Sequence, residues 1–240
     1  YNLQFNKNNK LQHFLNIESL SKEHINEIID LADKYIKNES NKFKDLEGKT
    51  IASLFFEPST RTKTTFELAS KRLSADFINI DIANSSALKG ESILDMIKTL
   101  EAMECDMFIV RHSSSGTPHY IAKEVGKKIS VINAGDGIHA HPTQAMLDMY
   151  TIKKHKGSFE NLNVSIVGDI LHSRVAKSLI ASLKILSVKN INIIGPKNLM
   201  PENINELGVN YFSNLEKGIN NVDVIIMLRL QQERMKEAFI

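Results

Sequence analysis

The sequence predicts an α/β protein made of two doubly wound parallel-sheet domains joined by helices. Short β-branched runs follow one another along the chain, and stretches with helical periodicity separate them. This alternation is typical of a parallel sheet with helices on both faces. The series begins again after a Lys-rich segment, Lys153–Gly157, which indicates a second α/β half. The predicted strands are Thr50–Phe56, Phe77–Ile82, Met107–Val110 and Ser130–Asn133, then Asn163–Val167, Asn190–Ile194, a weaker Val209–Phe212 and Val222–Leu228.

Two helices have clear starting signals. Ser21 can cap a helix whose apolar residues recur at helical spacing as far as Ile36. Pro142 suits the first position of a helix that runs to about Lys154 and leads from the first half into the second. We therefore expect domains at residues 1–150 and 151–240, with the ligand site in the cleft between them.

Composition excludes several classes of protein. The 240 residues contain 30 basic and 28 acidic side chains, a net charge of +2, and 42% of the residues are hydrophobic. This composition describes a globular chain and excludes a wholly disordered one. The near-neutral charge argues against a protein that coats nucleic acid. Cys105 is the only cysteine, which rules out an intrachain disulfide and a zinc site built from cysteines. We see no signal peptide and no run of about 20 apolar residues that could span a bilayer, so we expect a cytoplasmic protein without a membrane partner.

The first candidate site follows the first predicted strand. Pro58 forces a turn, and Ser59, Thr60, Arg61 and Thr62 then arrive at the start of a helix. Backbone N–H groups, hydroxyls and a guanidinium that converge on a helix N-terminus can bind a phosphate or a similar anion. An ordinary capped helix with a surface arginine would have the same composition, so both interpretations stay open here.

A second candidate is the Gly-rich loop before the helix that starts at Pro142. His139, His141 and Asp136 invite a metal-site hypothesis, but two histidines two residues apart on a loop, with no further ligand at a convincing spacing, do not favour it. A neutral His141 that donates a hydrogen bond to a carbonyl, with Gln144 close behind it, is chemically as reasonable. We therefore expect no metal, and a solvated loop histidine is the remaining alternative.

Arginines mark the ends of two strands in the second half. Gly168 ends a strand as in a dinucleotide-binding fold, but the later glycines of that motif are absent, which argues against a nucleotide cofactor. Arg174 follows this strand, and Arg229, Gln231 and Arg234 follow a later one. Because the carboxyl ends of parallel strands face the ligand crevice, these arginines indicate a partner that carries carboxylates. No hydrolase elbow, P-loop or zinc-protease motif occurs.

These motifs resemble the aspartate/ornithine carbamoyltransferase superfamily. The loop Ser59–Thr62 is similar to its carbamoyl-phosphate signature, and His141–Gln144 is similar to its second shared motif. The segment Met227–Arg234 resembles the aspartate-binding stretch of the aspartate carbamoyltransferase catalytic chains, which favours that branch over the ornithine branch. The resemblance runs from His13 to Arg234, and it implies a carbamoyl-phosphate-binding domain at 1–150 and an aspartate-binding domain at 151–240.

The resemblance also implies roles for individual residues. Carbamoyl phosphate would be held by Ser59, Thr60, Arg61, Thr62, Arg111, His141 and Gln144, together with Ser85 and Lys89 from the adjacent subunit of a homotrimer. L-Aspartate would be held by Lys89, Arg174, Arg229 and Gln231. Catalysis would depend on Arg61, Thr62, Lys89, Arg111 and His141, and Glu57 would pair with Arg234 when the domains close.

The implied reaction is attack of the aspartate amine on carbamoyl phosphate in pyrimidine biosynthesis, without metal or organic cofactor. A non-catalytic carbamoyl-phosphate-binding module and an ornithine carbamoyltransferase are the alternatives. Regulatory chains or a dihydroorotase are further partners that the sequence leaves open. The family continues past Arg234, so we expect 240 residues to be part of a longer chain, of which the aspartate domain lacks its C-terminal part.

Overall fold

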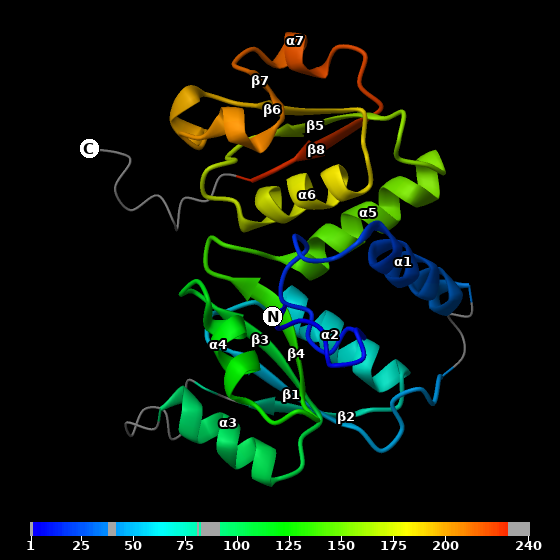
Figure 1. Ribbon diagram of the computed structural model, residues 1–240, viewed down its shortest axis with the longest axis vertical. Coiled ribbons are helices and arrows are strands. Elements are labelled where there is room, and N and C mark those ends of the chain that lie inside the picture. The colour runs from blue at the N-terminus through cyan, green and yellow to red at the C-terminus, as the bar shows by residue number, and fades with distance from the viewer. Residues whose placement is uncertain (1, 38–41, 81, 83–91, 230–240) are drawn as a thin grey trace. The chain divides into compact units, whose positions relative to one another are not determined.

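The computed structural model describes residues 2–37, 42–80, 82 and 92–229, and these form two compact units (Figure 1). Unit 1 comprises Tyr1–Ser19 and Asp33–Thr143, and unit 2 comprises Leu20–Ala32 and Gln144–Ile240. Within the described residues each unit contains one four-stranded sheet, and every strand pair in both sheets is parallel. The predicted fold class is thereby confirmed. None of the helices in the described ranges is long and apolar enough to cross a bilayer.

The sheet of unit 1 has the strand order β2-β1-β3-β4. Its strands are β1 (Thr50–Phe55), β2 (Asp76–Ile80), β3 (Met107–His112) and β4 (Ser130–Asp136), and its helices are α2 (Thr60–Arg72), α3 (Ile93–Ala102) and α4 (Thr117–Glu124). β3 and β4 both extend beyond their predicted ends. In β3 the extension is stabilised by pairing with β1, where Phe55 lies opposite Arg111. The carboxyl end of β3 therefore reaches as far as the end of β1.

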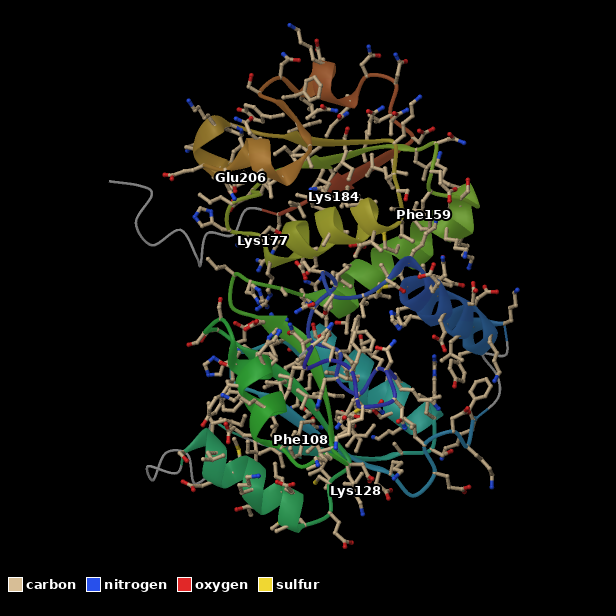
Figure 2. All side chains as sticks on the ribbon, in the orientation of Figure 1. Phe108, Lys128, Phe159, Lys177, Lys184 and Glu206 are labelled. Carbon is tan, nitrogen blue, oxygen red and sulfur yellow. The ribbon has the colours of Figure 1, made fainter. Side chains whose placement is uncertain are left out.

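Alternate residues of this sheet face two separate cores. Leu54, Phe108 and Val110 pack with α3 and α4 on one face, and Phe108 is fully buried there (Figure 2). Ile51 and Ile109 face the other side and pack with Phe66 of α2. Side chains alternate between faces along a strand, so a strand buried on both faces reads as a continuous apolar run. This is why the short β-branched runs predicted these strands well.

The sheet of unit 2 has the strand order β7-β6-β5-β8. Its strands are β5 (Asn163–Val167), β6 (Asn190–Ile194), β7 (Asn210–Phe212) and β8 (Val224–Met227), with α6 (Arg174–Ile185), α7 (Leu215–Ile219) and the short 3₁₀ helices η3 (Lys197–Leu199) and η4 (Ile204–Leu207). β5 and β6 are buried along four of their five residues, while β8 alternates between half-buried and exposed residues. The two central strands therefore carry the core of this unit.

Two further helices have the starts that the sequence predicts. α1 (Lys22–Ile36) follows Ser21, whose hydroxyl accepts a hydrogen bond from the His24 N–H at 3.3 Å. α5 begins at Pro142 and ends at Lys156, two residues beyond the predicted end. The division between the units falls inside α5, after Thr143.

Both sheets reverse their direction of winding next to their first strand. In unit 1 the chain goes from β1 to β2 on one side and then returns to β3 on the other, so the reversal lies between β1 and β3. In unit 2 it lies between β5 and β8. Ligands of doubly wound folds bind outside the carboxyl ends of the strands at such reversal points. The segments that follow β1, β3, β5 and β8 are therefore where the sites are expected.

Candidate functional site

The segment after β1 forms a helix N-terminus with unused donors. Ser59 is the N-cap of α2 and has an extended backbone, but its side chain makes no capping hydrogen bond. The first turn of α2 contains no acidic residue, and Thr60 and Arg61 are exposed. The first N–H groups of a helix have no partner inside it and carry the positive end of its dipole. One anion can therefore be bound by the Ser59 hydroxyl, these N–H groups and Arg61 together.

Arg111 lies across the reversal point of unit 1. Its Nε is 2.7 Å from Oε1 of Glu57, which follows β1, and its Nη1 donates to the Ala134 carbonyl of β4 at 3.1 Å. The two side chains of this ion pair are only 13% and 19% exposed. One guanidinium thus joins the carboxyl ends of three strands, and its direction is fixed before any ligand arrives. The resemblance pairs Glu57 with Arg234, whereas the structure pairs Glu57 with Arg111.

His141 and Gln144 lie at the start of α5. His141 is 8% exposed, and its Nδ1 is 3.4 Å from the Thr143 hydroxyl. If that hydroxyl donates, the ring proton lies on Nε2, and His141 can then donate to a ligand carbonyl. The Gln144 amide donates to Asp148 at 3.3 Å. Burial raises the pKa of Asp148 to about 6, and this hydrogen bond offsets part of the rise.

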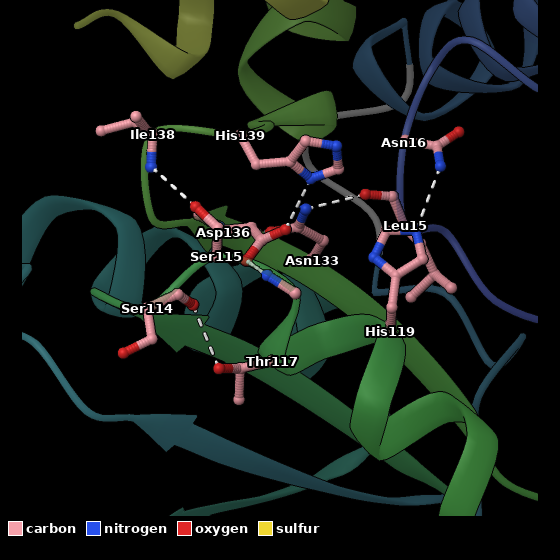
Figure 3. A network of polar contacts seen from close by, with 12 residues as sticks. Leu15, Asn16, Ser114, Ser115, Thr117, His119, Asn133, Asp136, Ile138 and His139 are labelled. Carbon is pink, nitrogen blue, oxygen red and sulfur yellow. Dashed lines mark hydrogen bonds and ion pairs between the residues drawn. The ribbon is translucent and has the colours of Figure 1, made fainter.

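A polar network beside this site contains one residue, His119, that sequence reasoning did not find (Figure 3). Asp136 is fully buried at the end of β4 and contacts His139 and the Gly116 N–H. His119 of α4 completes a group of three possible metal ligands in the described part of the chain. The sequence hypothesis grouped Asp136 with His139 and His141 and did not favour a metal. His119 was missed because it is 17 residues before Asp136 and nothing in its local pattern marks it. Only the crossing from β3 through α4 to β4 brings it close.

The reversal point of unit 2 collects the predicted arginines on neighbouring segments. Arg174 is the first residue of α6 and is buried, and Arg229 follows β8 and is exposed. The segments touch because Gly168, at a φ of 127°, leaves no room for a side chain: a Cβ there would lie 2.8 Å from the Leu228 carbonyl oxygen. The Leu228 N–H also donates to Val167 at 2.8 Å. Two guanidinium groups from these segments suit a ligand with carboxylates.

A buried pair supports the start of α6. Asp169 is fully buried after β5, and its carboxylate is 2.9 Å from Nδ1 of His172. Its Oδ1 also accepts from the His172 N–H at 3.1 Å. The Ser173 hydroxyl then caps α6 by accepting from the Ala176 N–H at 3.1 Å. The backbone that carries Arg174 is therefore fixed on both sides.

The structure brings together some of the predicted site residues and not others. Ser59, Thr60, Arg61, Thr62, Arg111 and Glu57 lie around the reversal point of unit 1, and Arg174 and Arg229 lie at that of unit 2. Ser85, Lys89, Gln231 and Arg234 lie outside the described residues. Their predicted roles stay predictions, as do the pairing of Glu57 with Arg234 and the division of the chain near residue 150.

Comparisons with known proteins agree with this arrangement. A family profile described as aspartate/ornithine carbamoyltransferase, carbamoyl-P binding domain, matches residues 12–154. The catalytic subunit of M. jannaschii aspartate transcarbamoylase is 34% identical, with a TM-score of 0.82 over 95% of this chain and 77% of that one. Aspartate transcarbamoylase from Trypanosoma cruzi, in complex with carbamoyl aspartate and phosphate, is 30% identical, with a TM-score of 0.85 over 94% of this chain and 74% of that one. The same enzyme with N-(phosphonacetyl)-L-aspartic acid gives a TM-score of 0.82 at 30% identity, over 93% and 76% of the two chains. The chain therefore belongs to the aspartate/ornithine carbamoyltransferase family, as a member of its aspartate carbamoyltransferase group.

Proposed function

We propose that this enzyme transfers the carbamoyl group of carbamoyl phosphate to the amino group of L-aspartate, as a step of de novo pyrimidine (UMP) biosynthesis. The observation that carries the proposal is Arg111, which Glu57 and the Ala134 carbonyl hold at the reversal point of unit 1, where the N-terminus of α2 also begins. Similarity to the T. cruzi enzyme with carbamoyl aspartate and phosphate supports the same chemistry.

Unit 1 is proposed to bind carbamoyl phosphate. The phosphate would accept hydrogen bonds from Ser59, from the first N–H groups of α2 and from the side chains of Arg61 and Thr62. An anion at a helix N-terminus gains both hydrogen bonds and a favourable dipole. Arg111 and His141 would donate to the carbamoyl oxygen, and Gln144 would lie by the carbamoyl amino group. The fixed geometry of Arg111 supports this role because its orientation costs nothing at the moment of binding.

Unit 2 is proposed to bind L-aspartate through its two carboxylates. Arg174 and Arg229 would each pair with one carboxylate, in the geometry that a guanidinium fork favours. The contact between Gly168 and Leu228 supports this role, because it sets the spacing between the segments that carry the two arginines. Lys89 and Gln231 complete the proposed aspartate site.

The reaction forms one bond and breaks another at the carbamoyl carbon. The uncharged aspartate amine attacks this carbon and the C–N bond forms. The C–O bond to phosphate breaks with its electron pair leaving on the phosphate, which can take up the proton that the amine loses. Negative charge develops on the carbamoyl oxygen, where Arg111, Thr62 and His141 would stabilise it, and loss of one such donor typically costs about 10²–10³ in rate. Both substrates are anionic, so the arginines also offset their repulsion and hold them in line for attack.

We infer a homotrimer in which Ser85 and Lys89 of one subunit complete the neighbouring site. The support for the trimer is the resemblance alone. A cytoplasmic location also stays a prediction.

The proposal is tested by measuring product formation from carbamoyl phosphate with L-aspartate and, separately, with L-ornithine. We expect N-carbamoyl-L-aspartate and no citrulline. Arg61→Ala should lower the rate by at least about 10², while Arg72→Ala, at the opposite end of α2, should keep the parent rate. Citrulline as the product would favour the ornithine alternative. Binding of carbamoyl phosphate without turnover of either amine would favour a binding module.

A further inference from the structure

We propose that His119, Asp136 and His139 form a binding site for one divalent transition-metal ion of the zinc type. One ligand atom from each residue lies within 4.8 Å of the others. They come from two segments: His119 from α4, and Asp136 and His139 from the end of β4 and the loop after it (Figure 3). None of them is among the residues proposed to bind either substrate.

Asp136 is a carboxylate fixed in place for a ligand role. It is fully buried, and its Oδ1 accepts the Gly116 N–H at 2.7 Å. Its other oxygen, Oδ2, is 2.8 Å from Nδ1 of His139. The Asp136 N–H donates to the Ala140 carbonyl at 3.0 Å, which closes the loop that carries His139. A buried carboxylate is normally paired or bound to a metal. This one meets His139 with one oxygen, and a nitrogen of His119 lies within 4.8 Å of a carboxylate oxygen.

The loop is held against the start of α4. Gly137 has a φ of 48°, and a Cβ there would lie 2.3 Å from the Ser115 Oγ, so only glycine fits. The Ile138 N–H donates to the same hydroxyl at 3.3 Å. This close approach brings His139 to α4, where its ring centroid is 5.7 Å from that of His119. The backbone contacts of the loop with Ser115 therefore hold the two imidazole rings near each other.

The donor set suits an ion of the zinc type. Two imidazole nitrogens and one carboxylate oxygen are common ligands of zinc, iron, cobalt and nickel, and hard ions such as magnesium prefer oxygen alone. Tetrahedral ligands about 2.1 Å from zinc are about 3.4 Å apart. Pairs of ligand atoms therefore need to approach by at most about 1.4 Å from their present 4.8 Å limit. The 2.8 Å pair of Asp136 Oδ2 and His139 Nδ1 would separate by about 0.6 Å if both atoms bind the ion.

Access and outer support are also present. The side chain of His139 is 48% exposed, so an ion can enter from solvent and a water can take the fourth position. The Asn16 amide contacts Nε2 of His119 at 3.1 Å and orients its ring. In metal sites the second ring nitrogen of a histidine usually donates, so an ion on the other nitrogen of His119 would need the Asn16 amide turned with its oxygen toward Nε2. A bound ion would join the loop before His141 to α4.

The test is titration of the metal-free full chain with Zn²⁺, followed by calorimetry, and with Co²⁺, followed by its visible absorption. We expect one ion per chain and the intense bands of tetrahedral cobalt. His119→Gln and His139→Gln should each weaken Zn²⁺ binding by more than about tenfold, while His155→Gln, an exposed histidine in the last turn of α5, should bind as the parent does. Zn²⁺ should also raise the thermal midpoint of the parent and not of the two site variants.

Two results would overturn the proposal. One is that the parent binds neither Zn²⁺ nor Co²⁺ in a one-to-one ratio. The other is that His119→Gln and His139→Gln, shown to be folded by circular dichroism, bind Zn²⁺ with the affinity of the parent. The buried Asp136 is left unchanged in both variants because its loss would disturb the loop itself.

Discussion

Removing the carboxylate of Glu57 tests how the proposed phosphate site is built. Glu57→Ala leaves the Arg111 guanidinium, 13% exposed, without the oxygen that lies 2.7 Å from its Nε. Breaking a buried ion pair costs about 3–5 kcal/mol. Because some solvent reaches both side chains, we expect the free energy of unfolding to fall by about 2–3 kcal/mol. Glu57→Gln keeps a polar side chain of the same size beside the guanidinium, so it should cost less, about 1 kcal/mol.

A matched pair on the surface provides the control. Glu67 and Lys71 are also 2.7 Å apart, but their side chains are 31% and 60% exposed. Glu67→Ala should change stability far less than Glu57→Ala, because exposed ion pairs contribute little. Urea unfolding gives the stability of each variant, and calorimetric titration gives its affinity for carbamoyl phosphate. We expect Glu57→Ala to lose affinity at least tenfold because Arg111 is no longer held in line. Equal effects of Glu57→Ala and Glu67→Ala on both quantities would refute this account of Arg111.

Two further predictions concern unit 2. Burial raises the pKa of Asp148 from 3.8 to about 6. Ionising Asp148 therefore lowers the free energy of unfolding by up to about 3 kcal/mol, and solvent screening leaves roughly half of that. Because the pKa is raised in the folded state, this stability is lost as pH rises. Asp148→Asn cannot ionise, so its free energy of unfolding should exceed that of the parent by an amount that grows between about pH 4 and 7 to about 1–2 kcal/mol. A difference between the two that does not change with pH would contradict this. Gly168→Ala should cost about 1–3 kcal/mol and weaken aspartate binding about tenfold in calorimetry, because its Cβ would meet Leu228. Gly157→Ala also has a positive φ but no atom within 4 Å, so equal effects of the two variants on aspartate binding would exclude the clash as the cause.

The inner strands β1, β3, β5 and β6 were predictable from sequence because burial on both faces makes each a short apolar run. β5 (Asn163–Val167) and β6 (Asn190–Ile194) have the predicted bounds, and the start of α5 at Pro142 follows from the fixed φ of proline. The end of β3 was predicted too early, because the strand continues into the polar residues Arg111 and His112, which pairing with neighbouring strands keeps extended. Apolar patterning carries no signal for that continuation.

The site was predictable only where its residues follow one another along the chain. Ser59–Thr62 form one loop, and their composition at a helix start indicates an anion site. The partner of Arg111 was not predictable, because Glu57 is 54 residues away and an arginine offers no sign of which carboxylate it meets. His119 was missed for the same reason. Contacts between segments depend on strand order, and the sequence pattern does not contain that order.

The central claim is that unit 1 binds the carbamoyl donor and unit 2 binds aspartate, and one crossed titration tests it most directly. Arg61→Ala and Arg229→Ala are each titrated first with carbamoyl phosphate and then with L-aspartate. We predict that Arg61→Ala loses carbamoyl phosphate binding, while Arg229→Ala keeps it at parent affinity and loses aspartate. If Arg229→Ala lost carbamoyl phosphate, or if Arg61→Ala bound it as tightly as the parent, the division of the two substrates between the two units would be wrong.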